Sequence, residues 1–128
     1  MIVEAFLSCD GANDSRGKLN ILGTFNSINS EVIPVALPCF YIIGIIRYKK
    51  NEIGIHKVDV KIMQNNNVIF SALEGQEIEF NDFDGNDTFN MNIIVNVIGC
   101  EFKNYGEYYI NLQIDGILLA KSTLYIKP

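Results

Sequence analysis

His56 is the only histidine in the chain, so it is the first residue to consider for acid–base chemistry near neutral pH. A Ser-His-Asp triad or a histidine-bearing metal site would have to use it. It lies beside Gly54 at the start of a predicted strand, and the sequence identifies no partner for it. Three serines could act as nucleophiles, but none has the flanking glycines of a nucleophile elbow; they are Ser8, Ser15 and Ser71. We interpret His56 as a polar group at a strand edge and predict that the chain is not an enzyme. A hydrolase stays open only if several groups converge on His56.

A run of acidic and amide side chains offers a second kind of chemistry, because calcium prefers several oxygen ligands on one loop. The candidate ligands are Asp82, Asp84, Asn86 and Asp87. Their spacing differs from that of an EF-hand, and the alternative is a solvated, charge-rich turn between strands. Binding of calcium or a small ligand is therefore the second candidate function. The sequence indicates no cofactor.

The cysteines and the charge exclude several classes of function. The chain has three cysteines, Cys9, Cys39 and Cys100. An odd number of widely spaced cysteines argues against a disulfide framework and against a zinc site. We interpret them as small apolar fillers in a reducing compartment and expect a cytoplasmic location. The formal net charge of −5 disfavours nucleic acid as a partner. The apolar run 40–46 is far shorter than the roughly 20 residues of a membrane-spanning helix, so we expect no membrane contact.

The elements that must position these residues are strands. Isoleucine occurs 20 times and alanine 5 times, which favours strands over helices. Apolar residues alternate with polar ones along 56–63, 89–98, 107–115 and 117–126. In the last of these, the core-facing row is predicted to be Leu118, Ala120, Leu124 and Ile126. The run 39–48 is apolar on both faces, which predicts a central strand with something packed over its outer side.

Turn signals divide the chain into eight or nine short strands. Asp115-Gly116 separates two strand runs, as in a β-hairpin. The three asparagines at 65–67 separate 56–63 from a short run at 68–72 in the same way, and the acidic segment 74–87 that follows is interpreted as a charge-rich turn unless it holds a metal. The chain shows no linker or repeat, so residues 1–128 are one domain. We predict an all-β, antiparallel, immunoglobulin-like β-sandwich without substantial helix, and a small barrel is the alternative.

Several short motifs resemble a family of small bacterial proteins of unknown function. They are the stretch 17–25 after a strand ending at 9–10, the pair 37–38, the strand start 54–56 and the segment 105–108 with its closing hairpin. The resemblance runs over nearly the whole chain. It implies a stand-alone immunoglobulin-like sandwich and brings no activity with it.

Tyrosines near the last hairpin predict a contact surface. In immunoglobulin-like domains a tyrosine at a strand corner bonds back to the backbone, and Tyr108 shares the core-facing row, so we expect it to be structural. An apolar outward face is predicted for Tyr109, Ile117, Leu119 and Tyr125. The alternative is that a second sheet or loop covers this face. We therefore predict a non-catalytic intracellular interaction module that self-associates, through an edge strand or this face, or docks on a protein partner.

Overall fold

The computed structural model describes residues 1–82, 85 and 87–128, and it is all-β, as predicted. The described residues form eleven strands and one 3-10 turn. In chain order they are β1 (Ile2–Ser15), β2 (Lys18–Phe25), β3 (Ser27–Asn29), β4 (Val35–Ala36), β5 (Cys39–Lys49), η1 (Lys50–Glu52), β6 (Gly54–Gln64), β7 (Asn67–Phe80), β8 (Thr88–Ile98), β9 (Glu101–Phe102), β10 (Gly106–Ile114) and β11 (Ile117–Lys127). The predicted number of eight or nine strands is too low. β4 and β9 are only two residues long, which is too short to show an alternation of apolar and polar residues. None of the described helices is long and apolar enough to cross a membrane.

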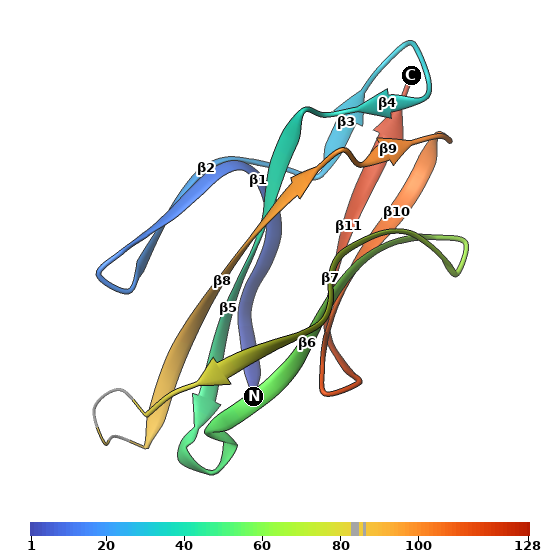
Figure 1. Ribbon diagram of the computed structural model, residues 1–128. Helices are drawn as coiled ribbons and strands as arrows, with labels where there is room; N and C mark the ends of the chain where they lie inside the picture. Colours follow the sequence, from blue (N-terminus) through green and yellow to red (C-terminus); the bar gives the residue numbers. More distant parts are fainter. Residues whose placement is uncertain (83–84, 86) are drawn as a thin grey trace.

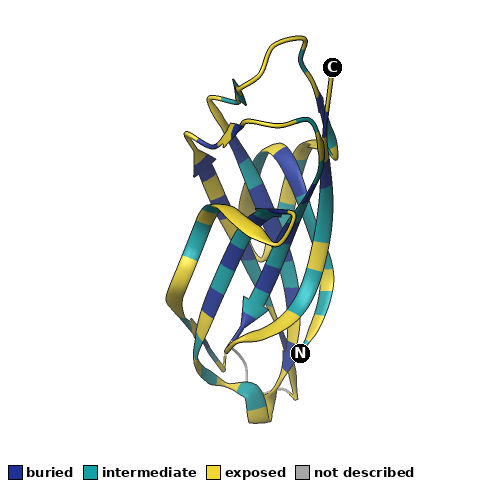
Figure 2. Ribbon diagram, turned by 90° about the vertical axis from the view of Figure 1, so that its right-hand side faces the viewer, coloured by how far each residue is buried: buried dark blue, intermediate teal, exposed yellow. Residues whose placement is uncertain are grey.

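Two main sheets share one core (Figure 1). Sheet A has the strand order β2-β1-β5-β8, and sheet B has the order β3-β11-β10-β6-β7. The pairing is antiparallel except between β3 and β11, which run parallel, so the prediction of a purely antiparallel fold is wrong at this edge. Figure 2 shows buried and exposed residues alternating along the strands, as expected where one face of each sheet packs on the core.

β5 is the central strand that the run 39–48 predicted. On its inner face Phe40, Ile42, Ile46 and Tyr48 are buried in the shared core. On its outer face Ile43 is also fully buried. The β1–β2 hairpin extends over this side, because the Asn92 side chain on β8 donates hydrogen bonds to Asp14 Oδ2 (3.0 Å) and to the Gly17 carbonyl (3.1 Å) at the hairpin tip. The predicted cover over β5 is therefore confirmed.

The hairpin turns at 65–66 and 115–116 follow the sequence signals. Asp115 and Gly116 both have positive φ angles, 52° and 80°, as a two-residue turn between β10 and β11 requires. Asn65 and Asn66 have φ angles of 50° and 65° in the β6–β7 turn, and asparagine tolerates this left-handed region better than most residues do.

β7 is much longer than predicted. We expected a short strand over 68–72 followed by an acidic turn, but the strand continues to Phe80 and includes Glu74, Glu77 and Glu79. Three register irregularities interrupt its pairing with β6. Bulges of this kind disturb strict alternation, which explains why the pattern along the sequence did not reveal the strand.

Tyr108 closes the corner before β10, and its predicted structural role is confirmed. Its buried hydroxyl donates to the Asn104 carbonyl (2.7 Å) and accepts from the Asn104 N–H (3.2 Å). Asn104 Nδ2 in turn donates to Gln64 Oε1 (3.3 Å), and the Tyr105 hydroxyl donates to the Ser30 carbonyl (2.9 Å). These neutral hydrogen bonds tie β6, β10 and the segment after β3 together at one end of the molecule.

Replacing Tyr108 by phenylalanine should lower the free energy of unfolding by about 1–2 kcal/mol, because the backbone N–H and C=O groups of Asn104 both lose their hydrogen-bond partner. Urea denaturation measures this loss. Tyr125→Phe is the control, since Tyr125 is on the surface and the change should stay within about 0.5 kcal/mol. Equal effects of the two substitutions would contradict the corner role.

Candidate functional site

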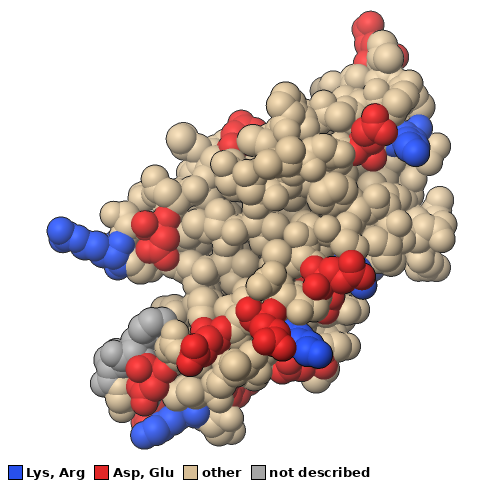
Figure 3. All heavy atoms as spheres, viewed as in Figure 1, with Lys and Arg blue, Asp and Glu red and all other residues tan. Residues whose placement is uncertain are grey.

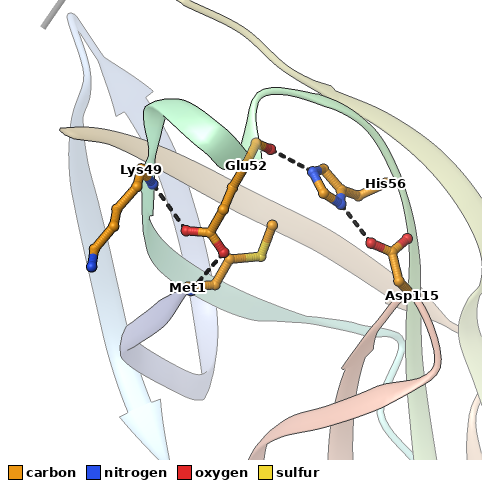
Figure 4. Close-up of polar contacts among 5 residues, drawn as sticks. All are labelled: Met1, Lys49, Glu52, His56 and Asp115. Atoms are coloured by element: carbon orange, nitrogen blue, oxygen red, sulfur yellow. Dashed lines mark hydrogen bonds and ion pairs between the residues drawn. The ribbon is translucent and has the colours of Figure 1, made fainter. Parts of the chain in front are cut away.

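His56 lies at the start of β6 and connects two turns (Figure 4). Its Nδ1 is 2.6 Å from Asp115 Oδ2 in the β10–β11 turn, and its Nε2 is 2.6 Å from the Glu52 carbonyl in η1. The other oxygen of Asp115 accepts the Lys57 N–H at 2.9 Å. The sequence had identified His56 but not these partners, because the pairing of β6 with β10 brings residues 56 and 115 together.

Both partners of His56 are acceptors, so the ring is best satisfied when both nitrogens carry a proton. Burial by itself lowers the pKa of His56, but the hydrogen bonds to Asp115 and to the Glu52 carbonyl outweigh it and raise this pKa above its ordinary value. The hydrogen bond from His56 also lowers the pKa of Asp115. With both nitrogens engaged as donors, the ring has no lone pair directed at a nucleophile, and this geometry is that of a structural ion pair.

Glu52 joins the N-terminus to the same end of the molecule. Its Oε2 accepts a hydrogen bond from the Met1 α-amino group (2.8 Å), and its Oε1 accepts one from the Lys49 N–H (3.0 Å). The hydrogen bond from the α-amino group is the main reason that the pKa of Glu52 is lowered. A hollow of about 220 Å³ beside this cluster is lined by Met1, Glu52, His56, Ile114, Asp115, Ile117 and Leu119.

A β-bulge divides the predicted contact surface in two. The pairing of β10 with β11 passes from Leu112–Ala120 to Gln113–Leu118, which leaves Leu119 as the extra residue. Beyond the bulge Ile117 opposes the buried Ile114, so it points to the inner side, where it and Leu119 line the hollow beside His56. Leu118 instead faces outward with Gln113 and is 49% exposed, so its predicted place in the core row is wrong. The four predicted residues therefore do not form a single face.

Tyr109 and Tyr125 remain together on the outer face of sheet B. Lys121 Nζ lies 4.0 Å from the centre of the Tyr109 ring, and Lys127 Nζ lies 5.8 Å from that of Tyr125. The negative charge of Glu107, which is opposite Tyr125, raises the pKa of both phenols. This face thus combines aromatic rings with charges of both signs, and its role in binding stays a prediction.

The predicted calcium ligands are only partly described. Asp84 and Asn86 lie outside the described residues. Asp82 Oδ1 accepts the Gly85 N–H at 2.7 Å, and the Asp87 carbonyl accepts the Lys50 N–H at 3.1 Å. Within the part of the chain that the structure describes, no group of three or more His, Cys, Asp or Glu side chains is placed to hold a metal ion.

The three cysteines are free thiols in different settings. Cys9 and Cys100 are buried, as the filler interpretation expects, whereas Cys39 is exposed and contradicts it. Burial raises the pKa of Cys100 to about 11 and also raises that of Cys9. Both buried thiols therefore stay protonated near neutral pH, which suits packing rather than nucleophilic chemistry.

The outer side of β8 forms one of the two edges of sheet A. β8 is the terminal strand of that sheet and pairs with β5 over all eleven residues, from Thr88 to Ile98, without a register shift. It contains no charged residue, no proline and no glycine. We call the unpaired side of this strand the β8 edge. Every second residue of a terminal strand turns its backbone N–H and C=O groups away from the sheet, so among the residues that the structure describes the β8 edge presents donors and acceptors that no other strand pairs.

Sheet B protects its edges by devices that β8 lacks. β3, at one edge, is three residues long. β7, at the other, has three register irregularities and carries Glu74, Glu77 and Glu79. Figure 3 shows acidic side chains along the course of β7. Short length, bulges and charge are the usual ways in which proteins prevent an edge strand from pairing with another chain, so β8 differs in being long, regular and neutral.

Comparison with known proteins gives a family but no activity. The model of a family of unknown function, DUF6941, matches residues 4–127. This agrees with the resemblance to an uncharacterised family over nearly the whole chain. No curated protein matches the sequence. No solved structure matches it either.

The His56–Asp115 pair predicts a specific pH dependence. Because the pKa of His56 is raised above its ordinary value of 6.5, its contribution to stability is complete below about pH 6.5 and is lost as the pH rises through the folded-state pKa. The pKa of Asp115 is lowered from 3.8, so its contribution is present above that pH and is lost as the pH falls through the folded-state pKa. NMR titration of the single histidine should give a pKa above 6.5 that falls in Asp115→Asn.

Asp115→Asn retains an acceptor for the Lys57 N–H but removes the charge, so it isolates the ion pair. The stability difference between wild type and this variant should be larger at pH 5.5 than at pH 8. An unchanged histidine titration in the variant would show that the ion pair does not form.

Proposed function

The chain belongs to the family of unknown function DUF6941, and from its own geometry we propose that it is a non-catalytic protein-interaction module that binds an extended segment by strand addition at the β8 edge. In strand addition, main-chain hydrogen bonds give affinity and alternate side chains give specificity. The observation that carries this proposal is a regular, neutral terminal strand of eleven residues.

The side chains of β8 suit an added strand. Its inner row packs toward the core and consists of Phe89, Met91, Ile93, Val95 and Val97. On the outer face, Asn90 and Asn96 are exposed, Ile94 is 36% exposed and Ile98 is 65% exposed. An incoming strand therefore meets an apolar row on one face and amides with two isoleucines on the other. No charge on β8 has to be desolvated when a partner binds, which removes the largest cost of covering polar surface.

We also propose that the fold is immunoglobulin-like. The order β11-β10-β6-β7 in sheet B corresponds to strands G, F, C and C′ of a variable-type domain, and β1-β5-β8 in sheet A corresponds to A, B and E. The Tyr108 corner before β10, the strand in the position of F, supports this assignment. A constant-type domain has a further strand, D, next to E. In this chain β8 ends the sheet at that position, which accounts for its unpaired edge.

Two observations support a role without catalysis. Both nitrogens of His56 are engaged by Asp115 and the Glu52 carbonyl, and the buried Cys100 thiol has a high pKa. The free state of all three cysteines suits the cytoplasmic location that we expect for the module.

Selection of displayed random peptides against the intact chain tests strand addition without knowledge of the natural partner. Selected peptides should slow hydrogen exchange of alternate amides in Thr88–Ile98, because pairing protects the N–H groups that point away from β5. Ile94→Lys should weaken their binding, since a lysine on an edge strand opposes pairing.

The matched control is Ile69→Lys on β7, because Ile69 and Ile94 are both isoleucines that are 36% exposed. It should leave peptide binding unchanged. Peptides that protect β10 and β11 instead of β8 would overturn the proposal, as would a selection that gives no binder.

A further inference from the structure

We propose that the segment that adds to the β8 edge is β8 of a second copy of this chain. The two strands would run antiparallel about a two-fold axis at Ile93 and join two four-stranded sheets into one. This inference rests on the proposed function, because it identifies the partner for strand addition. An isologous contact of this kind closes after two copies, whereas head-to-tail contacts can continue into filaments.

Full overlap of the two strands defines one register. Aligning Thr88 with Ile98 of the second copy places Ile93 opposite its own equivalent. Phe89 then lies opposite Val97, and Met91 lies opposite Val95. All of these residues belong to the inner row, so apolar side chains meet apolar side chains along the entire strand. The two cores become adjacent across the junction.

The same register also matches the outer row. Asn90 lies opposite Asn96 of the second copy, and this pair occurs twice because of the two-fold axis. Asparagine has both donor and acceptor atoms, so two such residues can bond to each other. Ile94 lies opposite Asn92, whose amide already bonds to the β1–β2 hairpin tip. A shift of one residue would place the apolar row of one copy on the polar face of the other, which disfavours that register.

The other edges suit a second copy less well. β7 carries three glutamates and irregular pairing, so two β7 strands would bring like charges together. β3 is only three residues long. β2 carries Lys18, and a left-handed Gly23 (φ 65°) whose neighbour across the pair is the Asp10 side chain. β8 is thus the edge of the described strands whose own sequence favours pairing with itself.

Light scattering on the intact chain, over a range of micromolar concentrations, should show a concentration-dependent dimer. Each copy has a net charge of −5, so added salt should strengthen association by screening repulsion. Alternate amides of Thr88–Ile98 should gain protection from hydrogen exchange as the concentration rises.

A charge swap tests the register. The double variant Asn90→Lys/Asn96→Lys places lysine opposite lysine twice and should weaken the dimer at least fivefold. The double variant Asn90→Lys/Asn96→Glu places lysine opposite glutamate twice and should restore or strengthen it. Asn90 and Asn96 are both exposed, so neither variant disturbs the core.

The outcomes separate this inference from the proposed function. If the chain stays monomeric while selected peptides still protect β8, strand addition stands and the second copy is ruled out as its partner. A dimer that both double variants weaken equally would overturn the register at Ile93. Dimerisation that leaves β8 exchange unchanged would overturn the interface.

Discussion

Burial of β5 on both faces is the constraint on which the rest of the structure depends. Few strands in a two-sheet protein are apolar on both sides, because one face normally meets water. Here sheet B covers the inner face. On the outer face Ile43 is fully buried, and the tip of the β1–β2 hairpin is hydrogen-bonded to Asn92 of β8 on that same side of the sheet. That second cover requires β1 to pair with β5 over its first half and with β2 over its second half. The long β1 and the curled hairpin therefore follow from the composition of one strand.

The same constraint leaves β8 in an unusual position. β8 pairs with β5 on one side and is bonded through Asn92 to the hairpin tip over its outer face. Its inner row is held in the core, whereas most of its outer face is exposed and meets the rest of the chain at Asn92. The remaining side is the β8 edge, where the regular pairing with β5 keeps the unpaired backbone groups in a straight row. A rigid, preorganised edge loses little conformational entropy when another strand pairs with it.

Local sequence patterns predicted the strands in which apolar and polar residues alternate regularly. They failed where the pairing of strands that are distant in the sequence determines which face a residue lies on or which residue it contacts. The runs 107–115 and 117–126 match β10 and β11 closely, and both hairpin turns were recognised from asparagine, aspartate and glycine. The bulge at Leu119 gives no signal in the sequence, because both of its neighbours are also leucines or small apolar residues. It reverses the faces of Ile117 and Leu118, and for this reason the predicted contact residues lie on two different faces.

The predicted length of β7 was too short for a related reason. The acidic half of this strand has only Ile78 and Phe80 on its buried side, so it shows little alternation in the sequence. The sequence indicates His56 as the residue for acid–base chemistry near neutral pH, but it does not indicate Asp115 as its partner, because the register of β6, β10 and β11 brings the two together.

Different kinds of interaction connect the segments at the two ends of the molecule (Figure 1). At the end that holds Met1, η1 and the β10–β11 turn, the connections are ionic and change with protonation. At the other end, the segments are connected by hydrogen bonds among amide, hydroxyl and carbonyl groups of Gln64, Asn104, Tyr105, Tyr108 and Ser30. A change in pH therefore acts on the ion pairs at one end of the protein, where His56, Asp115 and Glu52 have shifted pKa values. The molecule is chemically polarised along its long axis, although its strands run through from one pole to the other.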